Sequence, residues 1–375
     1  MMKKTGNIVI GIILLALLLN TFMINTPGKS KSSSEEQPFH FSEVGQISAE
    51  QPVFGLEVID KKAYFIEKDR GFIIYDVSDP SSCVELDEYL LSYPHDLSVE
   101  GDRAVVIDPQ VGVVILDISD SSDIKELGIF SDITDATHIY VAGDRVYIGD
   151  EGNGLKIVDI SDPASSVLLG TWKDTEGGVG DVYVIEDHVF VGLQLPRVNA
   201  PPLSLGLKVL DASDPVNITV ASTVGSGDEY LSFAPSDHVG SFVYLADAEN
   251  GFKILDFTDP GNVTCIGSYS NGETIVDFEI VGNYSFAVDS GKGFVVIDVS
   301  DPSGPFKVAS YEHPSLVINI DVVGEMVYLG TVNSGIRIIS RTEESGAVPE
   351  FELFVVIIVL VSIPLIVWKK GRKNP

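Results

Sequence analysis

Acidic side chains recur along this chain in two columns, with one member in most steps of about 42 residues. The first column contains Glu67, Asp108, Asp150, Asp247 and Asp289. The second contains Asp96, His138, Asp181, Asp277 and Asn319. Carboxylates are the ligands that Ca²⁺ prefers, and they also attract cationic partners or act as general acids and bases. For the first column we favour a structural interpretation, in which strand-end carboxylates accept turn amides. For the second column, binding and a structural role that joins neighbouring repeats are both open.

The columns are aligned on a glycine that opens a repeated phrase. Seven copies of this phrase read GFIIYDVSDP, GVVILDISD, GLKIVDISDP, GLKVLDASDP, GFKILDFTDP, GFVVIDVSDP and GIRIIS. A period in the low forties built from strand-like segments is typical of a β-propeller with one blade per repeat. The sequence therefore predicts an all-β, seven-bladed propeller over residues 39–341, with hydrophobic segments at both termini.

The third repeat shows how one blade is built. β-Branched and aromatic runs at 138–142, 146–149, 155–159 and 167–172 are separated by turn residues, which predicts four strands. Asp and Ser in the D-x-S-D-P phrase can bind nearby backbone amides, so we interpret that phrase as a structural turn. The first strand of each blade lies innermost, and the second column is therefore expected to ring the mouth of the central channel.

Counting strands predicts how the ring closes. The first three strands of a blade occur seven times, whereas the fourth follows only the first six repeats. The segment 41–47, FSEVGQI, is similar to the fourth strands KELGIF and TCIGSY. We expect it to form the outer strand of the last blade beside 335–339, which would remove open sheet edges.

The repeated phrase resembles the LVIVD-repeat family, through LKIVD at 155–159 and FKILD at 252–256. The resemblance covers about residues 40–340. It implies a propeller on a cell surface and carries no catalytic residues over to this chain.

The two ends indicate export and anchoring. Residues 1–25, with Lys3, Lys4 and an apolar run at 8–19, predict a signal peptide or an N-terminal anchor, and 26–38 a linker. In residues 342–375, the motif Pro349, Glu350, Phe351 precedes an apolar run and a basic end, which resembles the PEF-CTERM sorting signal of archaeal surface proteins. The resemblance implies an archaeosortase-type enzyme that replaces the tail with a lipid anchor; the alternative is a transmembrane anchor. Either places the propeller on the extracellular face of the membrane or in the envelope.

Charge narrows the range of partners. Residues 35–352 contain all 55 acidic and 16 basic residues, a net charge of −39. The negative electrostatic field of this segment excludes nucleic acid as a binding partner and favours cations. Three glycosylation sequons begin at Asn217, Asn262 and Asn283, and we place all three on the face opposite the acidic columns.

The remaining features concern reactivity and loops. Cys83 and Cys265 belong to blades that are not neighbours, so we expect free, buried thiols. The fourth blade carries an extended loop at 194–205. The sequence contains no H-E-x-x-H, C-x-x-C, P-loop or G-x-S-x-G motif.

These observations lead to two functional hypotheses. The first is an exported surface propeller that acts as a binding or scaffold module for protein, envelope polymer or cation through its acidic face. The alternative is a surface hydrolase or lyase that uses the channel carboxylates with a divalent cation such as Ca²⁺. An enzyme requires carboxylates that converge on one reacting atom and have raised pKa values.

Overall fold

The computed structural model describes residues 38–175, 177–195, 203–225, 237–247, 251–270, 274–289 and 293–343. The chain divides into two units, Met1–Gln37 and Pro38–Pro375, and every strand of the described residues belongs to the second. The N-terminal segment 1–25, the tail from residue 344 and its motif Pro349, Glu350, Phe351 lie outside the described residues. Within the described residues, no helix has the length and apolar character needed to cross a membrane.

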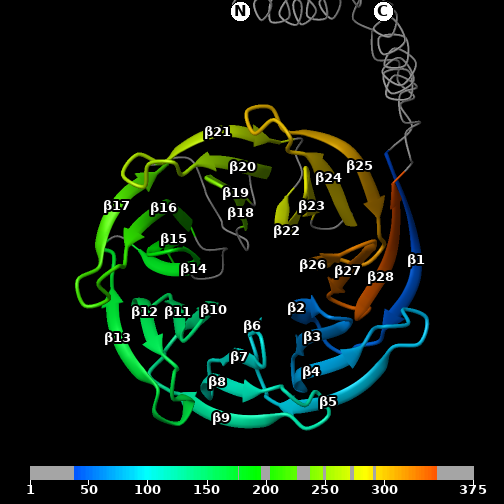
Figure 1. Ribbon diagram of the computed structural model, residues 1–375, viewed down its shortest axis with the longest axis horizontal. Helices are drawn as coiled ribbons and strands as arrows, with labels where there is room; N and C mark the ends of the chain where they lie inside the picture. Colours follow the sequence, from blue (N-terminus) through cyan, green and yellow to red (C-terminus); the bar gives the residue numbers. More distant parts are fainter. Residues whose placement is uncertain are drawn as a thin grey trace, which may run out of the picture. The chain divides into compact units, whose positions relative to one another are not determined.

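Seven four-stranded antiparallel sheets form a ring of blades, which confirms the predicted propeller (Figure 1). In each blade the strands follow chain order from the axis to the rim, except in the last. The first four blades comprise β2 (Val53–Ile59), β3 (Lys62–Glu67), β4 (Gly71–Asp76) and β5 (Val84–Leu90); β6 (Asp96–Glu100), β7 (Arg103–Asp108), β8 (Gly112–Asp117) and β9 (Lys125–Phe130); β10 (Ala136–Ala142), β11 (Arg145–Asp150), β12 (Gly154–Asp159) and β13 (Val167–Trp172); and β14 (Gly178–Ile185), β15 (His188–Leu195), β16 (Leu203–Asp211) and β17 (Thr219–Val224).

The last three blades complete the ring. They comprise β18 (Asp237–Val239), β19 (Phe242–Asp247), β20 (Gly251–Asp256) and β21 (Thr264–Tyr269); β22 (Ile275–Val281), β23 (Tyr284–Asp289), β24 (Gly293–Asp298) and β25 (Phe306–Glu312); and β26 (Val317–Val323), β27 (Met326–Thr331), β28 (Ile336–Glu343) and β1 (Phe39–Ile47). A single turn of 3-10 helix, η1 (Pro163–Ser165), precedes β13.

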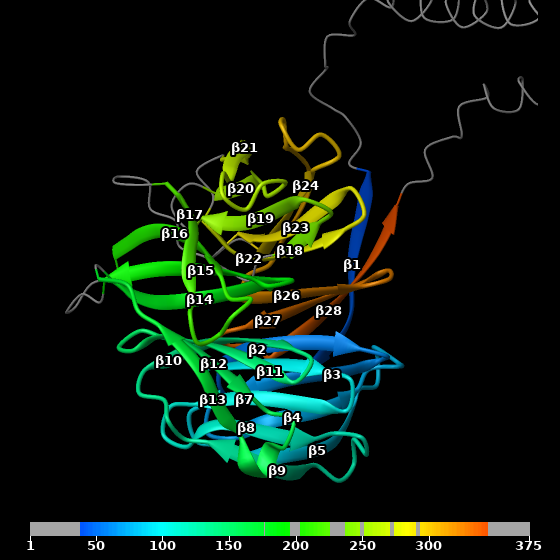
Figure 2. The ribbon, with the colours of Figure 1, turned by 60° about the vertical axis from the view of Figure 1, so that its left-hand side comes forward.

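The ring closes at its rim through the N-terminal strand, as the strand count predicts. β1 pairs antiparallel with β28, from Phe39 opposite Glu343 to Ile47 opposite Ile336. Both strands lie side by side in two views (Figures 1 and 2). The closing strand begins two residues earlier than the predicted 41–47, because Phe39 adds a buried aromatic side chain to the pair.

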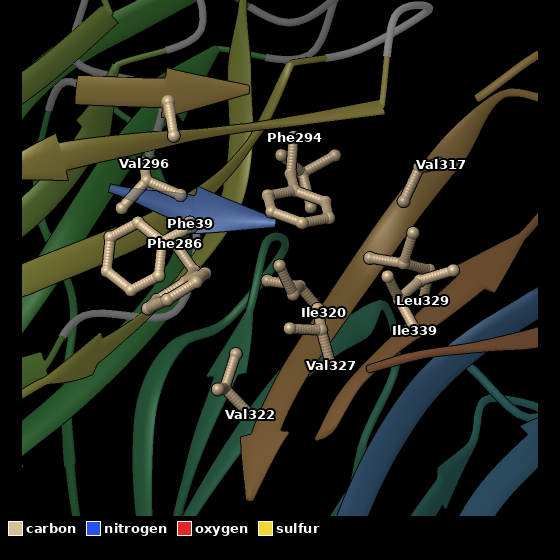
Figure 3. Packing of buried hydrophobic residues seen from close by; sticks show 12 residues of the cluster. Phe39, Phe286, Phe294, Val296, Val317, Ile320, Val322, Val327, Leu329 and Ile339 are labelled. Atoms are coloured by element: carbon tan, nitrogen blue, oxygen red, sulfur yellow. The ribbon is translucent and has the colours of Figure 1, made fainter. Parts of the chain in front are cut away.

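Apolar side chains fill the space between adjacent blades rather than one common centre. The described residues form seven core clusters, one at each blade-to-blade contact. In the cluster between the sixth and seventh blades, Phe39 of β1 lies beside Phe286 of β23, with ring centroids 5.8 Å apart (Figure 3). The closing strand therefore stabilises the ring by apolar burial as well as by backbone hydrogen bonds.

In four blades a close backbone approach joins the outer strand to the following blade, at Gly45, Gly128, Gly170 and Gly267; the equivalent positions of the other blades hold Asp87, Ser222 and Ala309. A Cβ atom added at Gly45 of β1 would lie 1.7 Å from the carbonyl oxygen of Pro80, in the turn between the third and fourth strands of the first blade. A Cβ atom added at Gly128 would likewise lie 2.0 Å from the carbonyl oxygen of Pro163. A side chain would collide at these four positions as the backbone stands, which explains their glycine.

The D-x-S-D-P phrases form turns, as the sequence predicts. In each, the first aspartate accepts a hydrogen bond from the amide two residues later. These aspartates are Asp76, Asp117, Asp159, Asp211, Asp256 and Asp298. The bonds from Ser78 hold the pKa of Asp76 below its usual value, as expected for a carboxylate used as a turn acceptor.

The extended loop of the fourth blade is partly strand. Gln194 pairs with Ser204 and Leu195 with Leu203, so the insertion lengthens the hairpin of β15 and β16. The alternation of apolar residues in QLPRVNAPPLSL is interrupted by proline, which hid this extension in the sequence. Residues 196–202 lie outside the described part of the chain.

Candidate binding site on the propeller axis

The inner strands of six blades surround a cavity of about 420 Å³ on the propeller axis. Its walls contain every member of the second column: Asp96, His138, Asp181, Asp277 and Asn319. The sequence therefore placed these residues correctly around the channel. A volume of this size is within the range of small-molecule sites.

Most members of this column also link their blade to the next one. Asp96 Oδ2 accepts a hydrogen bond from the amide of Ile139 at 2.9 Å. Asp277 Oδ2 accepts one from the amide of Ile320 at 2.8 Å. Asn319 Nδ2 donates to the carbonyl oxygen of Phe54 at 3.2 Å, which joins the last blade to the first. The other oxygen, Oδ1, accepts the amide of the following residue in both aspartates, so the structural interpretation accounts for both oxygens of Asp96 and of Asp277.

His138 links the third blade to the fourth through an ion pair with Asp181. Its Nε2 lies 2.9 Å from Asp181 Oδ1, and its Nδ1 lies 3.1 Å from the carbonyl oxygen of Gly180. Burial opposes protonation of this ring, but the Asp181 carboxylate outweighs it and raises the pKa of His138 to about 9. His138 is therefore a cation at neutral pH, and 41% of its side chain remains exposed in the channel.

A second tier of carboxyl groups, which the sequence did not reveal as a site, lies two residues further along the inner strands. Glu57 accepts the amide of Val99 at 3.1 Å, and Asp321 accepts the amide of Val58 at 2.6 Å. Both line the cavity. The equivalent positions in other blades hold Ser98, Tyr140, Tyr183 and Glu279, so no single residue type repeats there.

Removal from water raises the pKa of several of these carboxyl groups. Burial raises the pKa of Glu57 to about 8 and of Asp277 to about 7. It raises the pKa of Asp96 and of Asp321 to about 6. Raised pKa values are one of the two features expected of an enzyme. The other feature is convergence on one reacting atom. Asp321 and Asp96 lie near enough to Glu57 and Asp277 to act on their pKa values, so catalysis by these carboxyl groups stays a prediction.

The described members of the first column have the structural role that the sequence analysis favoured, and they are buried. Glu67, Asp108 and Asp150 are almost fully buried, with exposed fractions of 1%, 0% and 0%. Asp289 is likewise buried, whereas the Asp247 side chain lies outside the described part of the structure. This column does not form an exposed acidic ring, since the connecting loops cover it.

Backbone amides of those loops bind the buried carboxylates. Glu67 accepts the amides of Glu50 and Gln51, at 2.7 and 2.9 Å. Asp108 accepts those of Tyr93 and Gln110, at 2.9 and 2.8 Å. Burial acts to raise the pKa of Asp150, but hydrogen bonds from Asn153 and loop amides hold it below its usual value. These carboxylates fix the loops of the channel-mouth face.

Calcium binding stays a prediction. Among the residues that the structure describes, no three or more His, Cys, Asp or Glu side chains are grouped so as to hold a metal ion. The two columns are separated because one is buried beneath loops and the other lines the axis.

The other reactive positions lie on the surface. Asn217, Asn262 and Asn283 are all exposed, the first two beside turns between third and fourth strands and the last between β22 and β23. Cys83 and Cys265 are free thiols. The expectation that they are buried was wrong: Cys83 is half-buried, and Cys265 is exposed because β21 forms the rim of its blade.

Fold and cavity together define a closed seven-bladed β-propeller with a polar axial cavity. Comparison with protein families matches the LVIVD repeat at residues 56–90, 93–132, 134–174, 239–271 and 275–313. These segments make up half of the chain, and the chain belongs to the LVIVD-repeat family. A comparison with curated proteins finds no match.

Solved propellers share the architecture at low sequence identity. The WD40 repeats of RRP9 align with a TM-score of 0.64 and 8% identity, covering 82% of this chain and 99% of that one. U3-55K aligns with a TM-score of 0.61 and 8% identity, covering 80% and 98%. The computationally designed Ika8 protein aligns with a TM-score of 0.59 and 12% identity, covering 80% and 99%. These similarities show the fold alone.

Proposed function

We propose that this protein is an exported, anchored binding module of the cell surface, and that it recognises its ligand through the axial cavity. The main observation in support of this proposal is the cavity of about 420 Å³, whose lining combines carboxyl, imidazole and phenol groups from six blades. Ligand sites commonly combine such a hollow with a few polar groups of perturbed pKa.

The acidic residues fall into a buried group and a group that lines the cavity, and this difference supports a ligand site on the propeller axis. The first column is buried and bound to loop amides, so it has little to offer a partner. The carboxyl groups of the cavity keep further lone pairs beyond those used by the inter-blade amides. Binding in the cavity is therefore compatible with an intact ring.

Export and anchoring rest on the two terminal segments of the sequence. A basic cluster after the apolar run at 353–368 favours a cytoplasmic end and an external propeller. The tail motif Pro349, Glu350, Phe351 supports processing by an archaeosortase-type enzyme, with the transmembrane anchor as the alternative. The strongly acidic propeller and its exposed sequons are in keeping with an external, glycosylated protein.

A variant that fills the cavity tests the proposal. Ser98 lines the cavity from β6, and Ser98→Trp would place an indole in it. The binding of full-length protein in detergent to isolated envelopes of the producing cells is measured for wild type and variant. Glu325→Trp is the matched control, because Glu325 is exposed in the turn between β26 and β27.

Loss of envelope binding by Ser98→Trp alone supports recognition through the cavity. Equal binding by wild type and Ser98→Trp, with both folded, contradicts it. Circular dichroism melting of each variant establishes that the comparison is made on folded protein.

A further inference from the structure

The walls of the axial cavity differ in chemistry from one side to the other. The sixth, seventh, first and second blades contribute mainly carboxyl groups: Asp277, Glu279, Asp321, Glu57 and Asp96. The third and fourth blades contribute His138, Tyr140 and Tyr183, with Asp181 bound to the imidazole. Their inner strands β10 and β14 lie across the axis from β22 and β26 (Figure 1).

The aromatic wall is held in place by its own contacts. The rings of Tyr140 and Tyr183 meet edge to face, with centroids 5.1 Å apart. The Tyr183 hydroxyl and the Nδ1 atom of His238 lie 2.8 Å apart. A fixed aromatic surface beside a cavity is suited to an apolar or aromatic ligand body, and its ring faces attract cations.

Aromatic side chains also lie at the edge of the cavity. Phe54 lines it and keeps 39% of its surface exposed. Tyr93 is exposed to the same extent, and its ring centroid lies 4.9 Å from that of His95, another lining residue. These rings gain from contact with a ligand that has an apolar part, which is an observation independent of the carboxyl groups.

The carboxyl wall has a cationic neighbour in His138, which acts to lower the pKa of Asp96. No lysine or arginine occurs among the described residues that line the cavity. Glu57 faces Asp321 of β26 and Asp96 of β6, and both neighbours act to raise its pKa further. A cation placed among these groups would therefore relieve their mutual repulsion.

We propose that the axial cavity binds a small organic cation, whose protonated amine faces Glu57 and Asp321 and whose apolar or aromatic body lies against Tyr140 and Tyr183. The assignment rests on the proposed function, since it names the ligand class of the same cavity. A bare divalent cation fits less well, because the aromatic wall offers it no oxygen ligands.

Proton release is a specific consequence of this arrangement. Glu57 is partly protonated at neutral pH, because burial raises its pKa to about 8. An ammonium group beside it stabilises the carboxylate, so binding expels a proton. Affinity should then rise as the pH rises from about 6 towards 8, within the range in which the amine itself stays charged.

Calorimetry with 2-phenylethylamine tests the proposal, and 2-phenylethanol is the uncharged counterpart of the same shape. Full-length protein in detergent is titrated in two buffers of different ionisation enthalpy, which reveals protons released. We expect the amine to bind with proton release and the alcohol to bind at least about tenfold more weakly, as expected for the loss of one charge-assisted contact.

Two substitutions of equal charge change locate the site. Glu57→Gln retains an oxygen for the Val99 amide but removes the charge, and should weaken amine binding about tenfold and abolish the proton release. Glu325→Gln, remote from the cavity lining, should leave both unchanged. Equal binding of amine and alcohol, absence of amine binding, or equal effects of the two substitutions would overturn the proposal.

Failure of this ligand class is distinguishable from failure of the proposed function. If the amine does not bind but Ser98→Trp still abolishes envelope binding, the cavity is the site and its ligand is not an organic cation. If Ser98→Trp leaves envelope binding intact, the proposed function is itself contradicted.

Discussion

Asp321 in the last blade accepts the backbone amide of Val58 in the first blade at 2.6 Å, across 263 positions of sequence. At the rim of the same blade, β1 pairs with β28. The propeller is therefore closed twice, by a strand pair at its rim and by a side-chain link on its axis. The axial link belongs to the same tier of carboxyl groups that lines the cavity, so ring closure and the candidate site share residues.

Removing the axial link should weaken the ring. Asp321→Ala leaves the Val58 amide without its acceptor, and we expect a loss of about 1–3 kcal/mol in the free energy of unfolding. Asp321→Asn retains an acceptor oxygen and should lose less. Denaturant unfolding measures both. Equal stability of Asp321→Ala and wild type would show that the link contributes nothing to closure.

Stability should fall as the pH rises from about 5 to about 9. Burial raises the pKa of Glu57 to about 8 and of Asp277 to about 7, above their usual values near 4. A group whose pKa is raised in the folded state stabilises it below the unfolded pKa, and this contribution is lost as the pH passes the folded pKa. His138, with a pKa raised to about 9, acts in the same direction.

Melting temperatures measured across this pH range check the prediction. The double substitution Glu57→Gln with Asp277→Asn should flatten the profile, because neither amide side chain titrates. A wild-type melting temperature that is constant or rises between pH 5 and 9 would contradict the environments assigned to these groups.

The contact between the outer strand of the second blade and the third blade should be intolerant of a side chain at Gly128. A Cβ atom at Gly128 would lie 2.0 Å from the Pro163 carbonyl oxygen, so Gly128→Ala must displace backbone and should cost at least about 2 kcal/mol of unfolding free energy. Gly143 is the control, because no atom lies within 4 Å of its Cβ position and its φ is +59°. Gly143→Ala should cost about 1 kcal/mol from φ alone. Chemical denaturation that ranks the two in the opposite order would refute this packing.

The exposed thiol of Cys265 offers a test of which side of the membrane the propeller occupies. A membrane-impermeant maleimide applied to intact producing cells should label the protein, and Cys265→Ser should lose most of the label. Labelling that appears only after the cells are lysed would place the propeller inside the cell.

The sequence predicts the fold well because its signals are local and repeated. Glycine before the third strand recurs in every blade and Asp in the following turn in the first six, and the strand count alone identifies the segment that closes the ring. The second column was placed correctly because position along the inner strand fixes distance from the axis.

The second tier was beyond such reasoning, and so were the loop paths that bury the first column. Glu57 and Asp321 share their position with Ser98 and Tyr140, so no repeated residue type marks them. Asp108 is buried because a loop brings the Tyr93 amide within hydrogen-bond distance of its carboxylate. The path of such a loop cannot be predicted from the periodicity of the strands. A carboxylate at a strand end is the same in sequence whether it faces water or a covering loop.

Hydrogen–deuterium exchange of the full-length protein, with and without solubilised envelope extract, tests the central claim most directly. Recognition through the cavity predicts slower exchange in peptides of the inner strands β2, β6, β10 and β26, with the rim strands β5, β9 and β13 unchanged. Protection confined to the rim strands or to the D-x-S-D-P turns would contradict the account, because it would place the ligand away from the axis.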